Sequence, residues 1–179
     1  MLDVIKIPNE RISILIGTHG ETKKWLEKEL NVKIDVNSKN GEVVISGEAD
    51  AVYFASPVIK AIARGFNPKI AVKLKDPDYI FEIIDLRDYY NTENAMIRIK
   101  ARVIGKKGSI KKDIERMTSS FLSIYGHTIG IIAPYYAMPY AKEVVEKLVK
   151  GAKHSTALNY LSKARDEIVF KKLKGTKHV

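Results

Sequence analysis

The spacing of apolar and polar residues changes several times in the first third of this chain, and each change predicts an element boundary. Apolar residues recur at helical spacing on both sides of residues 17–20. Val32, Ile34 and Val36 then alternate with polar residues, as in a half-buried strand, and the Asn-Gly pair at 40–41 predicts a hairpin turn. The predicted order is strand, helix, glycine turn, helix, strand, strand and helix, at residues 3–7, 8–16, 17–20, 21–30, 32–36, 42–46 and 49–64.

The same order returns 88 residues further along the chain. This shift places Ile16, Gly17, Gly20, Lys23, Lys24 and Glu27 on Ile104, Gly105, Gly108, Lys111, Lys112 and Glu115. The second copy predicts a helix before its glycine turn, and then a helix, two strands and a helix at residues 109–117, 121–125, 128–133 and 139–149. One short motif is weak evidence, whereas two copies in one order of elements indicate a tandem repeat.

The segments outside the repeat are less regular. Residues 80–86 fit either the opening strand of the second copy or a helix, so the secondary structure of residues 75–94 stays open. An additional amphipathic helix is predicted over residues 153–170. Residues 171–179 are expected to form a frayed basic tail.

The charge of the chain is unevenly distributed. The net charge is +10, and residues 98–112 alone contain seven basic side chains and no acidic one. A local excess of this kind favours a binding face for a polyanion such as nucleic acid. An acidic membrane surface, or no partner at all, would also fit the net charge alone.

The glycine turn of the second copy is the candidate binding site. Gly105 and Gly108 flank Lys106 and Lys107, and glycine lets a backbone bend sharply and another backbone approach closely. The helix that follows begins with unpaired N–H groups, which favour an anion. Ser109 is predicted to cap this helix. The alternative is a solvated basic turn between two surface helices, because a single Gly-x-x-Gly is a short and often accidental pattern.

Cations near this turn extend the candidate site. Lys111 and Lys112 occupy the first turn of the following helix, where they oppose the helix dipole unless an anion docks nearby. On the preceding helix, Arg102 shares a face with Arg98, whereas Lys100 lies on the opposite side. At most part of this group is therefore expected to face one strand of nucleic acid.

The sequence offers no motif for catalysis, a cofactor or a metal. The four histidines are scattered without metal-ligand spacing, and there is no HExxH, paired-carboxylate or Walker-type pattern. The absence of cysteine excludes disulfides and thiolate metal sites. No signal peptide and no apolar run of membrane-spanning length is visible, so we expect a cytoplasmic protein. Because the catalytic motifs are missing, we also expect that it is not an enzyme.

The order βααββα with a Gly-x-x-Gly turn between the first two helices resembles the KH domain of eukaryotic topology, present here twice. Four segments, at residues 61–66, 84–89, 102–108 and 125–128, narrow the resemblance. They are similar to the archaeal two-KH family related to the eukaryotic "partner of Nob" small-subunit assembly factor. The resemblance implies an α+β fold of two tandem type I KH domains, each with a three-stranded antiparallel sheet and helices on one face. The expected division is a first domain, a linker, a second domain, and a helix with a tail, at 1–66, 67–79, 80–151 and 152–179.

This resemblance also implies a function. Members bind small-subunit ribosomal RNA near its 3′ end, assist the maturation of that end beside a separate endonuclease, are not enzymes, and are linked to the alpha subunit of initiation factor two. KH domains hold about four unpaired nucleotides, with the Gly-x-x-Gly turn against the backbone. Transferred to this chain, the clamp is Gly105, Lys106, Lys107 and Gly108, beside an apolar groove with candidates Ile104, Ile110, Ile114, Leu122 and Ile124. Each of these aliphatic residues also fits an ordinary core.

The first copy departs from the basic pattern. Its turn is Gly17, Thr18, His19 and Gly20, without Lys or Arg between the glycines. We therefore expect the second domain to supply most of the RNA affinity, and the first to bind weakly or to contact protein. His19 fits a phosphate donor when it is protonated, or a solvated loop histidine.

Two alternatives and one aromatic cluster complete the candidates. The chain also fits a scaffold for the processing nuclease or the initiation factor, or a general KH regulator of RNA. Tyr135, Tyr136 and Tyr140 follow the last predicted strand. They are suited to stacking on unpaired bases or to packing of the adjoining helix.

Overall fold

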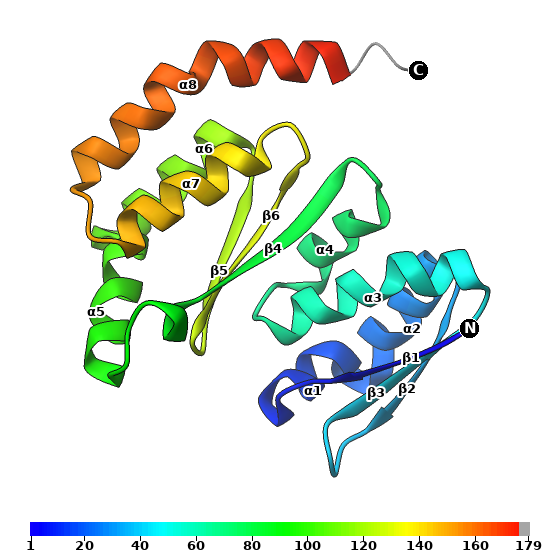
Figure 1. Cartoon of the computed structure of the whole chain (residues 1–179). Coiled ribbons are helices and arrows are strands. Elements are labelled where there is room, and N and C mark those ends of the chain that lie inside the picture. Colours follow the sequence, from blue (N-terminus) through cyan, green and yellow to red (C-terminus); the bar gives the residue numbers. More distant parts are fainter. Residues whose placement is uncertain (176–179) are drawn as a thin grey trace. The chain divides into compact units, whose positions relative to one another are not determined.

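The structure of this chain is a computed structural model that describes residues 1–175 (Figure 1). The chain divides after Tyr79 into two compact units. Each unit contains one three-stranded sheet and the helices that pack on it, so each is described by itself.

The first unit follows the predicted order of elements. These are β1 Leu2–Lys6, α1 Asn9–Ile16, the 3-10 turn η1 Thr18–Gly20, α2 Glu21–Leu30, β2 Lys33–Asn37, β3 Glu42–Ser46 and α3 Ala49–Ala63. The sheet order is β1-β3-β2, and both pairings are antiparallel, with Val4 opposite Val44 and Ile34 opposite Ile45. The central strand is therefore the last of the three along the chain.

The core of the first unit forms where the apolar faces of these elements meet. Leu15 on α1, Leu26 on α2 and Ile45 on β3 are fully buried, and so are Ile59 and Ile62 on α3. Burial of apolar surface stabilises this arrangement by about 25 cal/mol per Å² removed from water. Pro57 lies inside α3, which continues through this residue.

Residues 67–79, the expected linker, carry regular structure. They form the short helix α4 Pro68–Ala71 and the 3-10 turn η2 Val72–Lys75. The side chain of Asn67 caps α4 by accepting a hydrogen bond of 2.9 Å from the backbone N–H of Lys69. Ala71 and Leu74 are buried, and both elements contact α3.

The second unit repeats the order of the first. Its elements are β4 Tyr79–Asp85, the 3-10 turn η3 Leu86–Asp88, α5 Glu93–Ile104, the 3-10 turn η4 Lys106–Gly108, α6 Ser109–Thr118, β5 Phe121–Tyr125, β6 Thr128–Pro134, α7 Met138–Val149 and α8 His154–Gly175. The turn η3 and the helix α8 are additions to the order of the first unit. The sheet order is β4-β6-β5, which matches the first unit. Leu122 of β5 lies opposite Ile131 of β6 in an antiparallel pairing.

The strand β4 decides between the two structures predicted for residues 80–86. The helical alternative is wrong, because this segment is extended and pairs with β6. The strand ends where the side chain of Asp85 accepts a 3.0 Å hydrogen bond from the backbone N–H of Arg87. The Arg87 guanidinium also donates to this carboxylate, and it lowers the pKa of Asp85 to about 2.

The helix α8 is part of the core of the second unit. Ala157, Leu161, Ala164 and Ile168 are buried in the same cluster as residues of α5, α6 and α7. In Figure 1, α8 lies across α6 and α7. The expected frayed tail is wrong for residues 171–175, which continue this helix, and residues 176–179 lie outside the described residues.

Two hydrogen bonds hold α8 against α7. The Tyr160 hydroxyl donates to a carboxylate oxygen of Glu143 at 2.6 Å, and Lys171 Nζ donates to the Tyr140 hydroxyl at 2.8 Å. Burial and the bond to Glu143 raise the pKa of Tyr160 above its ordinary value, so the hydroxyl stays a donor. None of the helices in residues 1–175 combines the length and the apolar character needed to cross a membrane.

Candidate nucleic-acid interface

Both glycine turns adopt one unusual backbone conformation. Gly105 has φ 74° and ψ 175°, Lys107 has φ 53°, and Gly108 has φ 76°. In the first unit, Gly17 has φ 72° and ψ 178°, and His19 has φ 51°. The repeat therefore extends to backbone geometry, and both turns present the two residues between the glycines in the same way.

The first glycine of each turn is required by a close approach. A Cβ on Gly105 would collide with Ile110 Cγ1 and lie 2.9 Å from the Ile110 backbone nitrogen. A Cβ on Gly17 would collide with Thr22 Oγ1 in the same way. A Cβ on Gly108 would make only an ordinary contact of 3.9 Å with Lys112 Cε, but the positive φ of Gly108 disfavours any residue with a side chain.

The helix after the second turn begins without a side-chain cap. Ser109 is not the cap that the sequence predicted, because it is the first residue of α6 and Gly108 precedes the helix. The first-turn N–H groups of α6 therefore lack a capping side chain, beside the exposed Lys106 and Lys107. Such a helix end carries a partial positive charge that favours an anion.

Three of the seven cations in residues 98–112 make hydrogen bonds within the second unit. Lys100 Nζ donates to the Gly126 carbonyl at 3.1 Å. The Arg102 guanidinium donates to the backbone carbonyls of Gly151, at 3.1 Å, and Ala152. Lys111 Nζ lies 3.0 Å from a carboxylate oxygen of Glu115.

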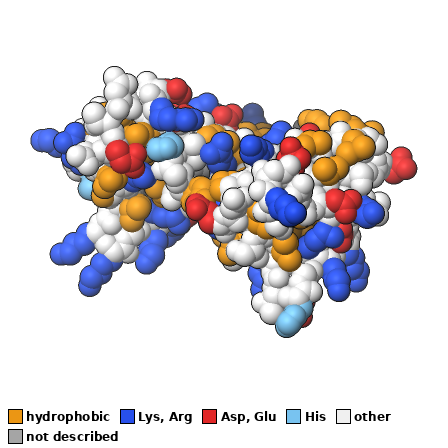
Figure 2. Space-filling model, turned by 90° about the horizontal axis from the view of Figure 1, so that it is seen from below, with side chains coloured by type: hydrophobic (Ala, Val, Ile, Leu, Met, Phe, Trp, Pro, Cys, Tyr) orange, Lys and Arg blue, Asp and Glu red, His pale blue; other side chains and the backbone are white. Residues whose placement is uncertain are grey.

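The remaining four cations face solvent. They are Arg98, Lys106, Lys107 and Lys112, and all four are exposed. Figure 2 shows side chains of Lys and Arg protruding together from the second unit, at the left of the view. The basic surface available to an anion is thus smaller than the sequence suggested, and it centres on the turn.

The first turn has the same backbone but a different surface. Thr18 and His19 are exposed in place of the two lysines, and Lys23 pairs with Glu27 at 3.1 Å. Arg11 donates to the backbone carbonyls of Ile62 and Phe66 at 2.8 and 2.7 Å. Arg11 therefore holds the end of the third helix of its unit, as Arg102 does in the second unit.

Three of the proposed groove residues lie in the core. Ile110, Ile114 and Leu122 are buried in the main apolar cluster of the second unit. Ile104 and Ile124 are half-buried and remain the candidates with accessible surface. Fewer residues are thus available to line the groove than the sequence suggested, because the three buried side chains fill the space between α6 and the sheet.

The three tyrosines have separate surroundings. Tyr140 is buried on α7, Tyr136 is half-buried, and Tyr135 is 48% exposed. The rings of Tyr135 and Tyr136 meet edge to face, with centroids 5.8 Å apart. Packing accounts for Tyr140, and Tyr135 is the most exposed of the three.

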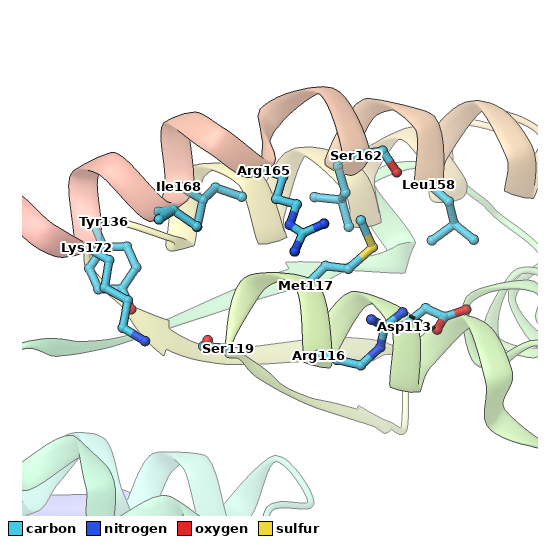
Figure 3. Close-up of a pocket in the computed structure, with 12 residues that line it drawn as sticks. Asp113, Arg116, Met117, Ser119, Tyr136, Leu158, Ser162, Arg165, Ile168 and Lys172 are labelled. Carbon is cyan, nitrogen blue, oxygen red and sulfur yellow. Dashed lines mark hydrogen bonds and ion pairs between the residues drawn. The ribbon is translucent and has the colours of Figure 1, made fainter.

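A groove of about 620 Å³ lies between α6 and α8 (Figure 3). In the close-up, Arg165 points from α8 toward Met117 on α6. On α6, Asp113, Arg116 and Met117 line this groove. Helical spacing places Asp113 and Met117 on the side of α6 away from Glu115.

A second concavity of about 640 Å³ lies beside the turn of the first unit. Its apolar lining comes from Ile14, Trp25 and Pro68, and Thr18 of the turn borders it. Ile14 occupies the position that Arg102 has in the second copy. The surface beside the first turn is therefore apolar where the second unit has a guanidinium.

Sequence reasoning missed the role of two aligned acidic residues on the helices that follow these turns. Glu27 and Glu115 each accept a hydrogen bond from a backbone N–H of the following strand, Ile34 and Leu122 respectively, both at 2.8 Å. A signal was present in the sequence. The 88-residue shift aligns Lys23 with Lys111 and Glu27 with Glu115, so each copy has a Lys followed by a Glu at i, i+4 spacing. Among residues 1–175, no group of three or more His, Cys, Asp or Glu side chains is arranged to hold a metal ion.

Comparison with known proteins identifies the repeated unit. A model of the KH domain matches residues 3–61, and a model described as the eukaryotic type KH domain (KH-domain type I) matches residues 80–166. Dim2p from Pyrococcus horikoshii has a crystal structure that superposes with a TM-score of 0.85 at 37% identity, covering 91% of this chain and 99% of that one. The chain belongs to the family of archaeal Dim2p. The expected α+β fold with two tandem KH domains is thereby confirmed.

Two further proteins match over most of the chain. The KH domain-containing protein MJ0443 of Methanocaldococcus jannaschii is 40% identical over 172 residues, which cover 93% of this chain and 75% of that protein. The pre-rRNA-processing protein PNO1 of Chaetomium thermophilum is 26% identical over 166 residues. This match covers 88% of the chain but only 63% of PNO1, so the chain spans less than two thirds of the fungal relative. The expected relation to the eukaryotic assembly factor is confirmed.

One solved structure of the family is a complex. It contains the Pyrococcus horikoshii proteins a/eIF2alpha and aDim2p with rRNA, and it matches with a TM-score of 0.87 at 36% identity, covering 93% of this chain and 95% of that one. A protein of unknown function from Aeropyrum pernix, APE0754, matches with a TM-score of 0.92 at 28% identity, covering 98% and 96%. Each of these two structures therefore matches more than nine tenths of this chain.

Proposed function

We propose that this chain binds single-stranded ribosomal RNA near the 3′ end of the small-subunit rRNA, as an assembly and processing factor without catalytic activity of its own. The observation that carries the proposal is the second glycine turn, where Lys106 and Lys107 are exposed in front of the uncapped start of α6. A phosphate there meets both side-chain charge and backbone N–H groups. The rRNA in the aDim2p complex and the processing role in the name of PNO1 support the choice of RNA.

The clamp is assigned to Gly105, Lys106, Lys107 and Gly108, with Lys112 beside it. Lys112 and Arg98 are the further cations that remain exposed. Arg102 and Lys111 also contribute to the basic surface, but Arg102 already donates to a backbone carbonyl and Lys111 is paired with Glu115. The turn of the first domain, residues 17–20, has the same backbone without these charges. It is the weaker RNA site, and its surface is available to a protein partner.

The partners follow from the same family. The complex of aDim2p with a/eIF2alpha supports the alpha subunit of initiation factor two as a partner of this chain. A separate endonuclease supplies the cleavage, because the chain itself is proposed only to hold the RNA. The apolar surface at Ile14 and Trp25, beside the less basic first turn, favours a scaffolding role for the first domain.

Charge reversal at the second turn tests this function. The double variant Lys106→Asp with Lys107→Asp should weaken binding of a short RNA with the 3′-terminal small-subunit sequence by at least about 100-fold, since each lost phosphate contact is replaced by repulsion. The salt dependence should fall as well, by a slope of about 1.4 for two phosphates at about 0.7 each. Fluorescence anisotropy across a salt series measures both quantities.

The matched control is Thr18→Asp with His19→Asp, which changes the same positions of the first turn. This control variant should weaken RNA binding much less than the Lys106 and Lys107 variant does. An unchanged affinity in the Lys106 and Lys107 variant would favour the scaffold over the RNA clamp. Crosslinking in cells followed by sequencing of the bound RNA locates the target, and crosslinks spread over messenger RNAs would instead indicate a general KH regulator.

A further inference from the structure

A carboxylate joins the second helix to the edge strand in both domains. Glu27 Oε1 accepts from the backbone N–H of Ile34 at 2.8 Å and lies 3.1 Å from Lys23 Nζ. Glu115 Oε1 accepts from the backbone N–H of Leu122 at 2.8 Å and lies 3.0 Å from Lys111 Nζ. The same oxygen, the same two partners and the same spacings thus recur after the 88-residue shift.

We call this carboxylate link between helix and strand the Glu tie. The strand in each Glu tie is at the edge of its sheet. The sheet orders β1-β3-β2 and β4-β6-β5 leave β2 and β5 each with one unpaired side. An edge strand carries backbone N–H groups without strand partners, and such a group is costly when it is shielded from water. Ile34 is fully buried and Leu122 is 4% exposed, so the carboxylate satisfies an N–H that water reaches poorly.

The tie also spans the walls of the proposed RNA groove. One wall is the helix that begins at the glycine turn, and the other is the edge strand with Ile124 half-buried on it. We propose that Glu115 is a positioning residue for RNA binding: its carboxylate fixes the spacing between α6 and β5, and it also fixes the position of Lys111. Glu27 has the same role in the first domain. This inference rests on the proposed RNA function.

The local electrostatics agree with a persistent tie. Burial works to raise the pKa of Glu27, but the hydrogen bond from Ile34 and the charge of Lys23 outweigh it, and the pKa lies below its usual value. The side chains of Glu115 and Lys111 are 21% and 32% exposed, so the pair is partly shielded from solvent. Lys111 therefore has a partner within the protein itself, whereas Lys112 is exposed.

Two substitutions of Glu115 separate position from charge. Glu115→Gln keeps an oxygen that accepts from the Leu122 N–H but removes the charge that holds Lys111, whereas Glu115→Ala removes both. We expect Glu115→Ala to weaken binding of the 3′-terminal small-subunit RNA about tenfold, and Glu115→Gln to remain within about threefold of the wild type. Hydrogen exchange by NMR should show faster exchange at the Leu122 amide in Glu115→Ala only.

The matched control is Glu27→Ala, which should speed exchange at Ile34 and leave binding at the second turn unchanged. Retained RNA affinity in Glu115→Ala, despite fast exchange at Leu122, would overturn the positioning role. Equal losses in Glu115→Gln and Glu115→Ala would also overturn it, in favour of a purely electrostatic effect. If the wild-type protein bound no such RNA, the proposed function would fail, while exchange at Leu122 would still show whether the tie exists.

Discussion

At the scale of single residues, the two glycines of a turn have different reasons to be glycine. Gly105 is fixed by the closeness of Ile110, which leaves no room for a Cβ, whereas Gly108 is fixed only by its positive φ. The φ and ψ of Gly105 lie in a region that is essentially restricted to glycine. The pattern Gly-x-x-Gly therefore combines a steric requirement with a conformational one.

This difference predicts unequal costs. Gly105→Ala should lower the free energy of unfolding by about 3 kcal/mol, because strain adds to the displacement of the buried Ile110. Gly108→Ala should cost about 1 kcal/mol, the ordinary penalty for a left-handed residue. Urea unfolding of both variants measures the difference, and equal destabilisation would show that the contact with Ile110 relaxes freely.

At the scale of elements, α8 determines where the second domain ends. Its buried face belongs to the apolar cluster of α5, α6 and α7, and its polar contacts reach Glu143 and Tyr140 on α7. The helix is therefore a structural part of the second KH domain and also one wall of the groove shown in Figure 3. The predicted division instead placed this helix, within residues 152–179, after the second KH domain.

Truncation of one buried side chain on α8 tests this role. Leu161 is fully buried, so Leu161→Ala should lower the free energy of unfolding by about 3 kcal/mol through lost burial and the remaining cavity. The exposed Lys163 on the same helix is the control, and Lys163→Ala should stay within about 0.5 kcal/mol. Thermal or urea unfolding decides the question. A loss below about 1 kcal/mol for Leu161→Ala would mean that α8 is only loosely attached.

At the scale of the whole molecule, one backbone design is used twice with different surfaces. Both domains share the sheet order, the turn dihedrals and the Glu tie. They differ in the residues between the glycines, which are Thr18 and His19 in one turn and two lysines in the other. The repeat therefore separates the scaffold, which is common, from the charge, which is specific to the second domain.

This separation predicts a gain of function. Thr18→Lys with His19→Lys should restore measurable RNA binding to a chain that also carries Lys106→Asp and Lys107→Asp, because the first turn already has the required backbone. Lysine tolerates φ near 53° at Lys107, so the substitution at His19 adds little strain. Anisotropy with the same short RNA measures the recovery. No recovery would mean that the groove of the first domain, and not its charge, excludes RNA.

The sequence by itself determined the repeat, the position of the glycine turns and the order of the elements that follow each turn. Periodicity, glycine placement and the Asn-Gly turn act over a few residues, so these features are legible without tertiary contacts. Only the tertiary structure decided which cations remain free. Lys100 and Arg102 donate to carbonyls 26 and 49 residues away, and Glu115 accepts from a strand seven residues ahead. Spacing alone does not specify such partners, because the fold brings them together.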